Sequence, residues 1–546
     1  METGLAPGPG DSKKPGGKKE WFVLFLIILF ILFVRISLLE VPLERDEGEY
    51  AYMGQLLLKG IPPYSQAYTM KFPGTYLMYA LLMLLSGQTI AGIHLGFTIV
   101  NCITIILIYL LAKKITGGYA ALIAAGVYAV LSLSPGVLGL AAHATHFVVL
   151  FAVGGTLLLF EALEKGDRLH WYLWSGIVSG IAFIMKQHGL FFILFCASYM
   201  IVEHYSSSPH FVRKKLMPRL AVYTFGTSLP LFATIAWLYT SGVFDKFWFW
   251  AVRYAEKYVS QMPLSRAFNL FISGLSGATG PFFLVWTLAF LGLIATFFHQ
   301  RLKVGKSFVL LFTLFSFLSV CPGFYFRGHY FVMLLPAVSI LVGILVDFMG
   351  SWDSASIKFP FYKILGLGLF ITAMTIGIVG EKEYFFKYDP ITVSRKIYGT
   401  DPFPESLRVA EFIKSRSNKD DKIAVFGSEP QIYFYSDRLS ATGYIYIYDL
   451  MKNHPYALTM QEEMVHEVES SKPKFITMVH IPTSWLRRPD SEVYIVGWID
   501  NYLRENYSLA GVADIISRNV TIYKWDQEAR GYKMKSAFYL LVFEKK

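Results

Sequence analysis

Residues 43–73 read LERDEGEYAYMGQLLLKGIPPYSQAYTMKFP and follow the first strongly apolar segment, Trp21–Leu39. Four acidic residues fall within the first seven positions: Glu44, Asp46, Glu47 and Glu49. The following residues, up to Lys59, have the composition of a helix, and Lys71 and Pro73 close the stretch. A charged loop directly after an apolar block is typical of the rim of a membrane. We therefore expect the functional carboxylates of the chain in this loop.

The composition of the chain indicates a polytopic membrane protein. Of its 546 residues, 54% are hydrophobic and only 16% are charged, and the mean hydropathy is +0.45. Soluble domains carry closer to about 25% charged residues. The formal net charge is +11. In a membrane protein such an excess reflects topology and anionic lipid headgroups, so we expect membrane lipids and no nucleic acid as partners.

Apolar blocks of membrane-spanning length predict about 11 crossing helices. They lie near residues 21–39, 93–111, 119–134, 147–163, 171–187, 189–203, 220–241, 281–298, 307–322, 330–349 and 361–380. The Lys- and Gly-rich tail, residues 1–20, is expected to be disordered and cytoplasmic. Residues 21–380 are expected to form the transmembrane domain. If the basic loops lie in the cytoplasm, then the first outer loop, residues 43–92, and the C-terminal residues 381–546 lie on the extracytoplasmic side of the membrane.

Three further segments complete the predicted architecture. Residues 73–87 are apolar but short, and they predict a re-entrant or interfacial helix. Phe244–Val259 is rich in aromatic residues and predicts a helix at the outer interface. Residues 381–546 alternate short β-rich runs with helical stretches, which indicates a small α/β domain. Its predicted strands are Lys422–Phe426, Lys474–Val479, Val520–Lys524 and Phe538–Phe543, and its predicted helices are 405–417, 456–470 and 494–507.

The acidic group of residues 44–49 admits three interpretations. Asp46 and Glu49 have the spacing of a helix capping box, a purely structural role. A carboxylate at a membrane rim can also accept a proton from an incoming hydroxyl, and the two roles are compatible. A loop for a divalent cation would need a regular alternation of oxygen ligands, which these residues lack.

Basic and metal-ligating residues also gather on the predicted outer side. Lys186 and Arg327 each end a span beside a histidine, where a cation suits a phosphate at headgroup depth, whereas Arg253 and Lys257 fit interface anchors. His143 and His146 form a plausible zinc pair without a readable third ligand. Four histidines lie on this side: His143, His146, His188 and His329. The three cysteines form no metal motif, so no metal cofactor is expected, and a divalent ion stays an open alternative.

The chain resembles the GT-C superfamily of polyprenyl-phosphate-sugar-dependent glycosyltransferases over roughly residues 20–350. More narrowly it is similar to the bacterial RgtA/B/C/D-like branch related to protein O-mannosyltransferases and aminoarabinose transferases. The matching motifs are RDEGEYAYMGQLLLKGIPPY, KFPGTYLMYALL, MKQHG and FRGHYFVMLLPAVSILVG. The resemblance implies a GT-C fold with an appended extracytoplasmic domain, a location in the bacterial inner membrane, and a role in the cell envelope.

The resemblance also implies site residues. Asp46 would be the catalytic base, with Glu47 beside it in the catalytic motif. Lys71, Arg327 and, more weakly, Lys186 would bind the donor phosphate. The substrate pocket would be lined by Tyr50, His146, His329 and Tyr330. Where relatives often carry an acidic residue, this chain has His143-Ala-Thr-His146, which leaves the acceptor class and metal dependence open.

These observations favour a hexosyl or pentosyl transferase that moves a sugar from a polyprenyl-phosphate donor to a glycan, lipid or protein, with inversion. The alternative is a transporter or flippase of lipid-linked sugars. Such proteins need ionisable groups near the bilayer midplane, whereas the charges here lie at one rim. A third possibility, a membrane-anchored binding protein, would place the function in residues 381–546, where no catalytic set is recognisable.

Overall fold

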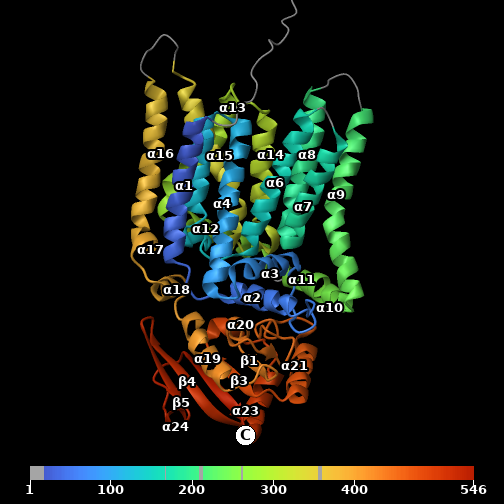
Figure 1. The fold of residues 1–546 in the computed structure, drawn as a ribbon, viewed down its shortest axis with the longest axis vertical. Coiled ribbons are helices and arrows are strands. Elements are labelled where there is room, and N and C mark those ends of the chain that lie inside the picture. The colour runs from blue at the N-terminus through green and yellow to red at the C-terminus, as the bar shows by residue number, and fades with distance from the viewer. Residues whose placement is uncertain (1–16, 166–167, 208–212, 260–261, 354–359) are drawn as a thin grey trace, which may run out of the picture.

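The computed structural model describes residues 17–165, 168–207, 213–259, 262–353 and 360–546. A layer of long helices lies above a smaller domain that contains a sheet (Figure 1). Of the predicted tail, residues 1–20, the first 16 residues lie outside the described part of the chain. The first helix, α1, begins at Lys18. The described chain thus has two layers, one apolar and helical and one α/β.

Within the described residues, seven helical stretches are long and apolar enough to cross a membrane. They are α1 (Lys18–Ser37), α4 (Ile90–Ile115), α6 (Ala144–Glu164), Gln187–Ser206 with α8 (Leu190–Ser207), α9 (Arg213–Thr240), Leu264–Phe298 with α13 (Phe283–Phe298), and α16 (Phe361–Gly380). Shorter apolar helices run beside them: α5 (Gly118–Leu131), α7 (Leu169–Met185), α14 (Lys306–Leu318) and α15 (Leu335–Gly350). Each predicted apolar segment therefore coincides with a helix of this layer.

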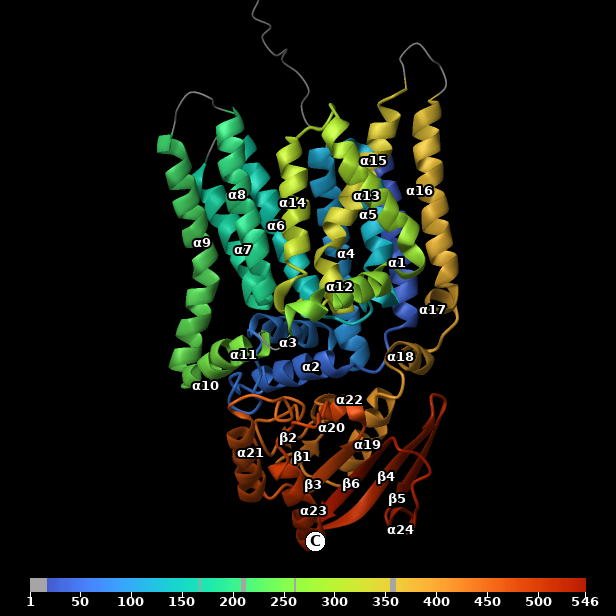
Figure 2. The same ribbon diagram turned by 180° about the vertical axis from the view of Figure 1, so that it is seen from behind.

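Several helices lie across the lower ends of the long ones (Figures 1 and 2). The predicted short helix at 73–87 is α3 (Gly74–Ser86), and it lies above α2 (Arg45–Leu58). The aromatic segment forms α10 (Phe244–Trp248), a π-helical turn over Phe249–Tyr254, and α11 (Ala255–Val259). α12 (Leu264–Thr279) was not predicted as a separate helix; it turns into α13 at Gly280, whose φ of 42° suits glycine.

The capping box suggested by the spacing of Asp46 and Glu49 is not the cap of α2. The N-cap is Glu44, and its carboxylate accepts a hydrogen bond from the Glu47 amide at 2.9 Å. Asp46 and Glu49 therefore do not form the capping box that their spacing suggests. Because the extended backbone of Glu44 lets its side chain turn back over the first turn, the cap is already filled. Asp46 is left with its carboxylate free for other partners.

The predicted C-terminal α/β domain is present, and its sheet has six strands in the order β2-β1-β3-β6-β4-β5. β1 (Lys422–Phe426) pairs in parallel with β2 (Leu439–Ser440) and β3 (Phe475–His480). β6 (Tyr539–Lys545), β4 (Tyr507–Ser517) and β5 (Val520–Trp525) extend it in antiparallel fashion. Two short helices connect α16 to this domain: α17 (Lys382–Phe386), which still packs on the helical layer, and α18 (Pro390–Tyr398). The helices of the domain itself are α19 (Phe403–Ser415), α20 (Gln431–Ser436), α21 (Ala457–Ser471), α22 (Pro482–Trp485), α23 (Tyr494–Asn506) and α24 (Gln527–Arg530).

The C-terminal domain packs directly against α2, as both views show. The Ser440 amide donates to the Tyr52 hydroxyl at 2.8 Å, and the Leu43 amide donates to the Tyr435 hydroxyl at 2.9 Å. The two parts come into close contact at Gly48, where an added Cβ would lie 2.7 Å from the Gln431 backbone nitrogen. The acidic loop and the C-terminal domain are consequently on the same side of the helical layer.

Candidate active site

Lys71 joins two carboxylates of α2. Its Nζ lies 2.9 Å from Asp46 Oδ1 and 2.5 Å from Glu49 Oε2. Asp46 and Glu49 are three residues apart and share one face of the helix. The side chain of Lys71 is 25% exposed, that of Asp46 is 17% exposed and that of Glu49 is fully buried. The ion pairs thus lie at a boundary between protein interior and surface.

The turn before α3 holds Lys71 in place. The Tyr64 hydroxyl donates to the Lys71 carbonyl at 2.6 Å. α3 is anchored to the end of α7, because the Thr75 hydroxyl donates to the Met185 carbonyl at 2.8 Å and Gly74 packs against the Ile184 carbonyl. This contact fixes Lys71 on the turn that faces the end of α7, where Lys186 follows Met185.

Glu49 is saturated with hydrogen bonds. Its Oε1 accepts from the Thr69 hydroxyl at 2.8 Å and from the Tyr76 hydroxyl at 2.7 Å. Its Oε2 accepts from Lys71 and from the hydroxyl of Tyr446, at 2.7 Å, which belongs to the C-terminal domain. The four donors hold this buried carboxylate in one orientation. Glu49 therefore serves as a fixed support for Lys71.

Asp46 has a different environment from Glu49. Burial opposes its ionisation, but the Lys71 ammonium, which attracts and hydrogen-bonds the carboxylate, holds the pKa of Asp46 well below its usual range. Burial likewise disfavours the Lys71 cation, yet Asp46 and Glu49 raise the pKa of Lys71 well above its ordinary value. With Oδ1 bonded to Lys71, the second oxygen, Oδ2, faces His143 at 3.9 Å. Asp46 is therefore a carboxylate with one oxygen fixed and one directed toward the histidines.

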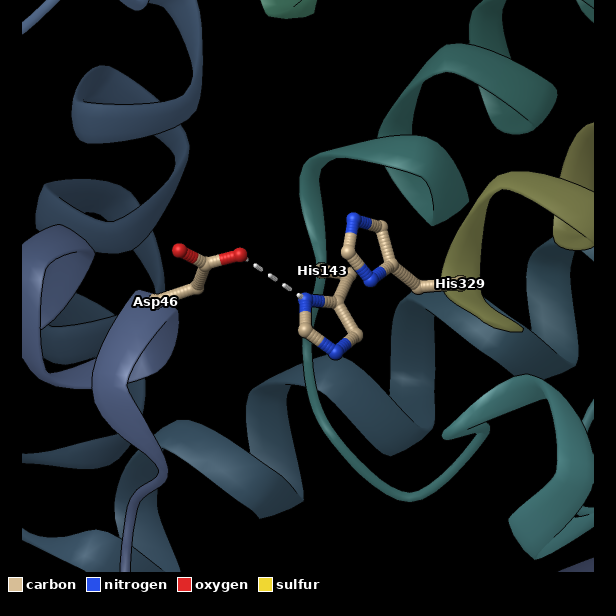
Figure 3. A group of neighbouring side chains, drawn as sticks. All are labelled: Asp46, His143 and His329. Carbon is tan, nitrogen blue, oxygen red and sulfur yellow. Dashed lines mark ion pairs between the residues drawn. The ribbon is translucent and has the colours of Figure 1, made fainter. Parts of the chain in front are cut away.

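Two histidines face Asp46 from different parts of the chain (Figure 3). His143 is the N-cap residue of α6, and His329 lies in a short 3-10 helix, Gly328–Met333. Their rings stack with centroids 4.3 Å apart at an interplanar angle of 18°. Burial lowers the pKa of His143 to about 4, and burial together with His143 and Lys186 lowers the pKa of His329. Both imidazoles are neutral at physiological pH.

Arg327 and Lys186 supply positive charge near this group. Lys186, in the connection between α7 and α8, lies over the Tyr330 ring with Nζ 4.1 Å from the centroid, and burial lowers its pKa to about 7. An Arg327 Nη donates to the Tyr258 hydroxyl at 3.3 Å. Among the described residues, no carboxylate oxygen lies within 4.0 Å of either cation. Lys186 is half-buried and Arg327 is exposed, and both cations are available to an anion.

The other predicted site residues divide into two groups. Tyr50 lies beside the central group, because its ring is 4.5 Å from Lys71 Nζ, and Tyr330 lies beneath Lys186. The Glu47 carboxylate turns elsewhere, accepting from the Ala142 amide at 2.7 Å and lying 3.2 Å from His94 Nε2. His146 packs edge-on against Phe97. Glu47 and His146 thus have surroundings apart from the Asp46–Lys71 pair.

The C-terminal domain contributes site residues that the sequence did not reveal. Tyr446 binds Glu49 and stacks on Tyr448 with centroids 4.8 Å apart. Lys452 lies over the rings of Tyr448 and Tyr258. The run Tyr444-Ile-Tyr-Ile-Tyr448 was the only signal, and alternating aromatic and β-branched residues ordinarily indicate a strand. Here the run is a loop that covers the acidic turn of α2.

Comparison with known proteins places the fold in one class. The chain is structurally similar to ArnT from Cupriavidus metallidurans bound to undecaprenyl phosphate, with a TM-score of 0.58, 15% identity and coverage of 96% of this chain and 98% of that one. It is similar to the archaeal oligosaccharyltransferase AglB from Archaeoglobus fulgidus, with an inhibitory peptide and dolichol-phosphate: TM-score 0.56, 12% identity, coverage 93% and 74%. It is also similar to the mycobacterial arabinofuranosyltransferase AftD: TM-score 0.52, 10% identity, coverage 98% and 40%.

At these identities the likeness shows the fold, and the predicted GT-C fold with a C-terminal α/β domain is confirmed. The sequence model of the family described as dolichyl-phosphate-mannose-protein mannosyltransferase matches residues 70–237. No curated protein sequence matches the chain significantly. The chain is therefore a multi-pass membrane protein with the fold of the GT-C glycosyltransferases.

Proposed function

We propose that this protein is an integral-membrane glycosyltransferase that moves a sugar from a polyprenyl-phosphate donor to an acceptor on the extracytoplasmic side of the bacterial inner membrane. The observation that carries the proposal is the pairing of Asp46 with Lys71 at the end of the helical layer that faces the C-terminal domain. Supporting it, two proteins of the same fold are described with undecaprenyl phosphate and dolichol-phosphate.

Asp46 acts as the general base. An acceptor hydroxyl gives its proton to Asp46, the acceptor oxygen forms a bond to the anomeric carbon, and the bond from that carbon to the phosphate oxygen breaks. The lipid phosphate leaves with the electron pair, and the attack from the opposite face inverts the anomeric centre. Lys71 holds the carboxylate in position through Oδ1, so Oδ2 takes the proton.

Lys186 and Arg327 stabilise the leaving phosphate. Lys71 is already neutralised by two carboxylates, which makes it a weak candidate for binding an additional anion. Lys186, which is half-buried, and Arg327, which is exposed, have no carboxylate within 4.0 Å in the described chain, so both can pair with an oxyanion. The charge of the leaving group grows in the transition state, so preplaced cations lower the barrier.

Mass spectrometry of cell-envelope glycans, lipids and proteins, with and without this protein, identifies the product that loses one sugar. Asp46→Asn is then tested for that product. We expect transfer to be lost while expression and thermal stability are retained. Asp437→Asn, which removes an exposed carboxylate paired with Lys59, is the matched control and should retain activity. Wild-type transfer by Asp46→Asn would exclude Asp46 as the base.

A further inference from the structure

The two imidazoles beside Asp46 lack hydrogen-bond partners. His143 is 1% exposed and His329 is 6% exposed. Within the described part of the chain, both ring nitrogens of His143 and Nδ1 of His329 make no hydrogen bond. The carboxylate oxygens of Glu44 and Asp46 come only to 3.8 and 3.9 Å from His143 Nδ1. Buried polar atoms are nearly always bonded, and orphaned ones in a native fold point to a bound water or ion.

Asp46, His143 and His329 each bring one potential ligand atom into the same small region. One ligand atom from each of Asp46, His143 and His329 lies within 4.8 Å of the other two. Figure 3 shows both rings on the same side of the Asp46 carboxylate. Ligands of a tetrahedral zinc ion with bonds of about 2.1 Å are roughly 3.4 Å apart. Coordination would therefore require the two stacked rings to turn until a nitrogen of each points at the same ion.

The donor set selects the kind of ion. Two imidazoles and one carboxylate suit zinc and related transition metals, and catalytic zinc sites commonly have three protein ligands with one position open. Ca²⁺ and Mg²⁺ prefer oxygen ligands, so they fit poorly. Lys71 bonds Oδ1 of Asp46 and thereby orients the carboxylate with Oδ2 toward His143, as outer hydrogen bonds do in metal sites.

The local charge also permits a divalent cation. Glu44, Glu47 and Glu49 lie within one turn of Asp46, and the cation of that turn, Arg45, is paired with Glu429 and Asp401 of the C-terminal domain. The three ligands come from α2, from the start of α6 and from the segment before α15, which only the folded chain brings together. A bound ion would consequently tie three elements of the membrane layer to each other.

We propose that Asp46, His143 and His329 bind a zinc-class divalent cation, with one coordination position left for water or a substrate oxygen. The His143-x-x-His146 pair suggested by the sequence is not this site. His146 faces Phe97, and the third ligand is instead His329, 186 residues after His143. The evidence for the cation site is the ligand geometry alone, and it does not depend on the glycosyltransferase assignment. Because a bound ion and the acceptor proton would both use Asp46 Oδ2, the two roles of Asp46 are alternatives that the test below separates.

The test uses full-length protein in lipid nanodiscs, freed of metal by chelator and titrated with Zn²⁺ by calorimetry and with Co²⁺ by visible absorption. We expect one equivalent of either ion, with Co²⁺ bands typical of four- or five-coordinate sites. His143→Ala and His329→Ala should each weaken binding by more than about 100-fold, beyond the effect of outer-shell changes. His146→Gln, a matched buried histidine, should bind as wild type does.

Further variants keep the test decisive if an alanine variant fails to fold. His143→Cys and His329→Cys retain a metal-binding atom and should keep Zn²⁺ binding, with a sulfur-to-cobalt charge-transfer band. Absence of a stoichiometric site in the wild type, or equal binding by wild type and both alanine variants, would overturn the proposal. If Asp46→Asn loses transfer but the wild type has no metal site, only the role of Asp46 as a base is supported. If the wild type has the metal site but Asp46→Asn transfers normally, only the cation site is supported.

Discussion

The hydroxyl of Tyr446, in the C-terminal domain, donates to the carboxylate of Glu49, on the first outer helix, at 2.7 Å. The same Glu49 oxygen accepts from Lys71, and Lys71 bonds Asp46. A chain of three contacts therefore runs from the C-terminal domain to the proposed base. The domain takes part in the site and is not only an appendage to the membrane layer.

Tyr446→Phe should impair transfer while the protein stays folded. The change removes one donor from Glu49 and leaves three, so we expect a loss of about 1 kcal/mol of stability. Lys71 would shift toward the freed Glu49 oxygen and away from Asp46, and kcat should fall more than KM rises. Kinetics on the product identified by mass spectrometry measures the change. Tyr494→Phe, on the exposed face of α23, is the control and should match wild type.

Lys71→Met should destabilise the protein strongly. It leaves Asp46 and fully buried Glu49 without their cation, and breaking a buried pair from one side costs about 3–5 kcal/mol. Thermal unfolding in nanodiscs measures the change. The double variant Lys71→Met with Glu49→Gln removes the unpaired charge and should recover part of the loss. If the loss of stability in the double variant equals the sum of the losses in the two single variants, the pairing of Lys71 with Glu49 is contradicted.

Binding of a lipid phosphate should weaken with rising pH through Lys186. Its pKa of about 7 in the free protein means that its charge is present below that pH and is lost above it. A bound anion requires the charged form, so affinity should fall by up to about tenfold per pH unit above 7. Undecaprenyl phosphate is the probe. Lys186→Arg stays charged and should not show this fall, and identical pH profiles for both proteins would refute the role of Lys186.

Gly48→Ala should weaken the contact between α2 and the C-terminal domain. Alanine alone would favour the helix by about 1 kcal/mol, but the new methyl group would meet the Gln431 backbone at 2.7 Å. Overpacking of this kind costs about 1–3 kcal/mol, so the net effect should be destabilising. Gly497→Ala, in α23 with open space around it, should instead stabilise the protein slightly. Limited proteolysis and thermal unfolding compare the two, and equal behaviour would argue against close packing at Gly48.

Local sequence patterns predicted the helical layer well, because membrane helices depend on apolar length that a short window of sequence contains. β1, β3, β5 and β6 were also placed within two residues by their β-rich runs. β4 (Tyr507–Ser517) was missed, since its start overlaps the end of the predicted helix 494–507 and its register shifts between Leu509 and Gly511. Irregular strands of this kind carry little periodic signal.

The candidate site was only partly predictable, because long-range contacts decide it. Asp46 and Lys71 belong to one motif, and their meeting needed only a helix and a turn. The stacking of His143 on His329 depends on how α6 packs against the segment before α15, which no short window of sequence contains. Tyr446 was likewise hidden, since nothing local indicates that its loop covers α2.

The docking of the C-terminal domain on α2 has a consequence for protein engineering. A chimera that joins the membrane layer of this protein to the C-terminal domain of a relative would lose the Tyr446 hydroxyl and the close fit at Gly48 unless the loop of residues 441–452 were transplanted with matching residues on α2. The two parts must therefore be exchanged together with their shared surface, and a functional boundary for gene fusion does not coincide with the end of α16.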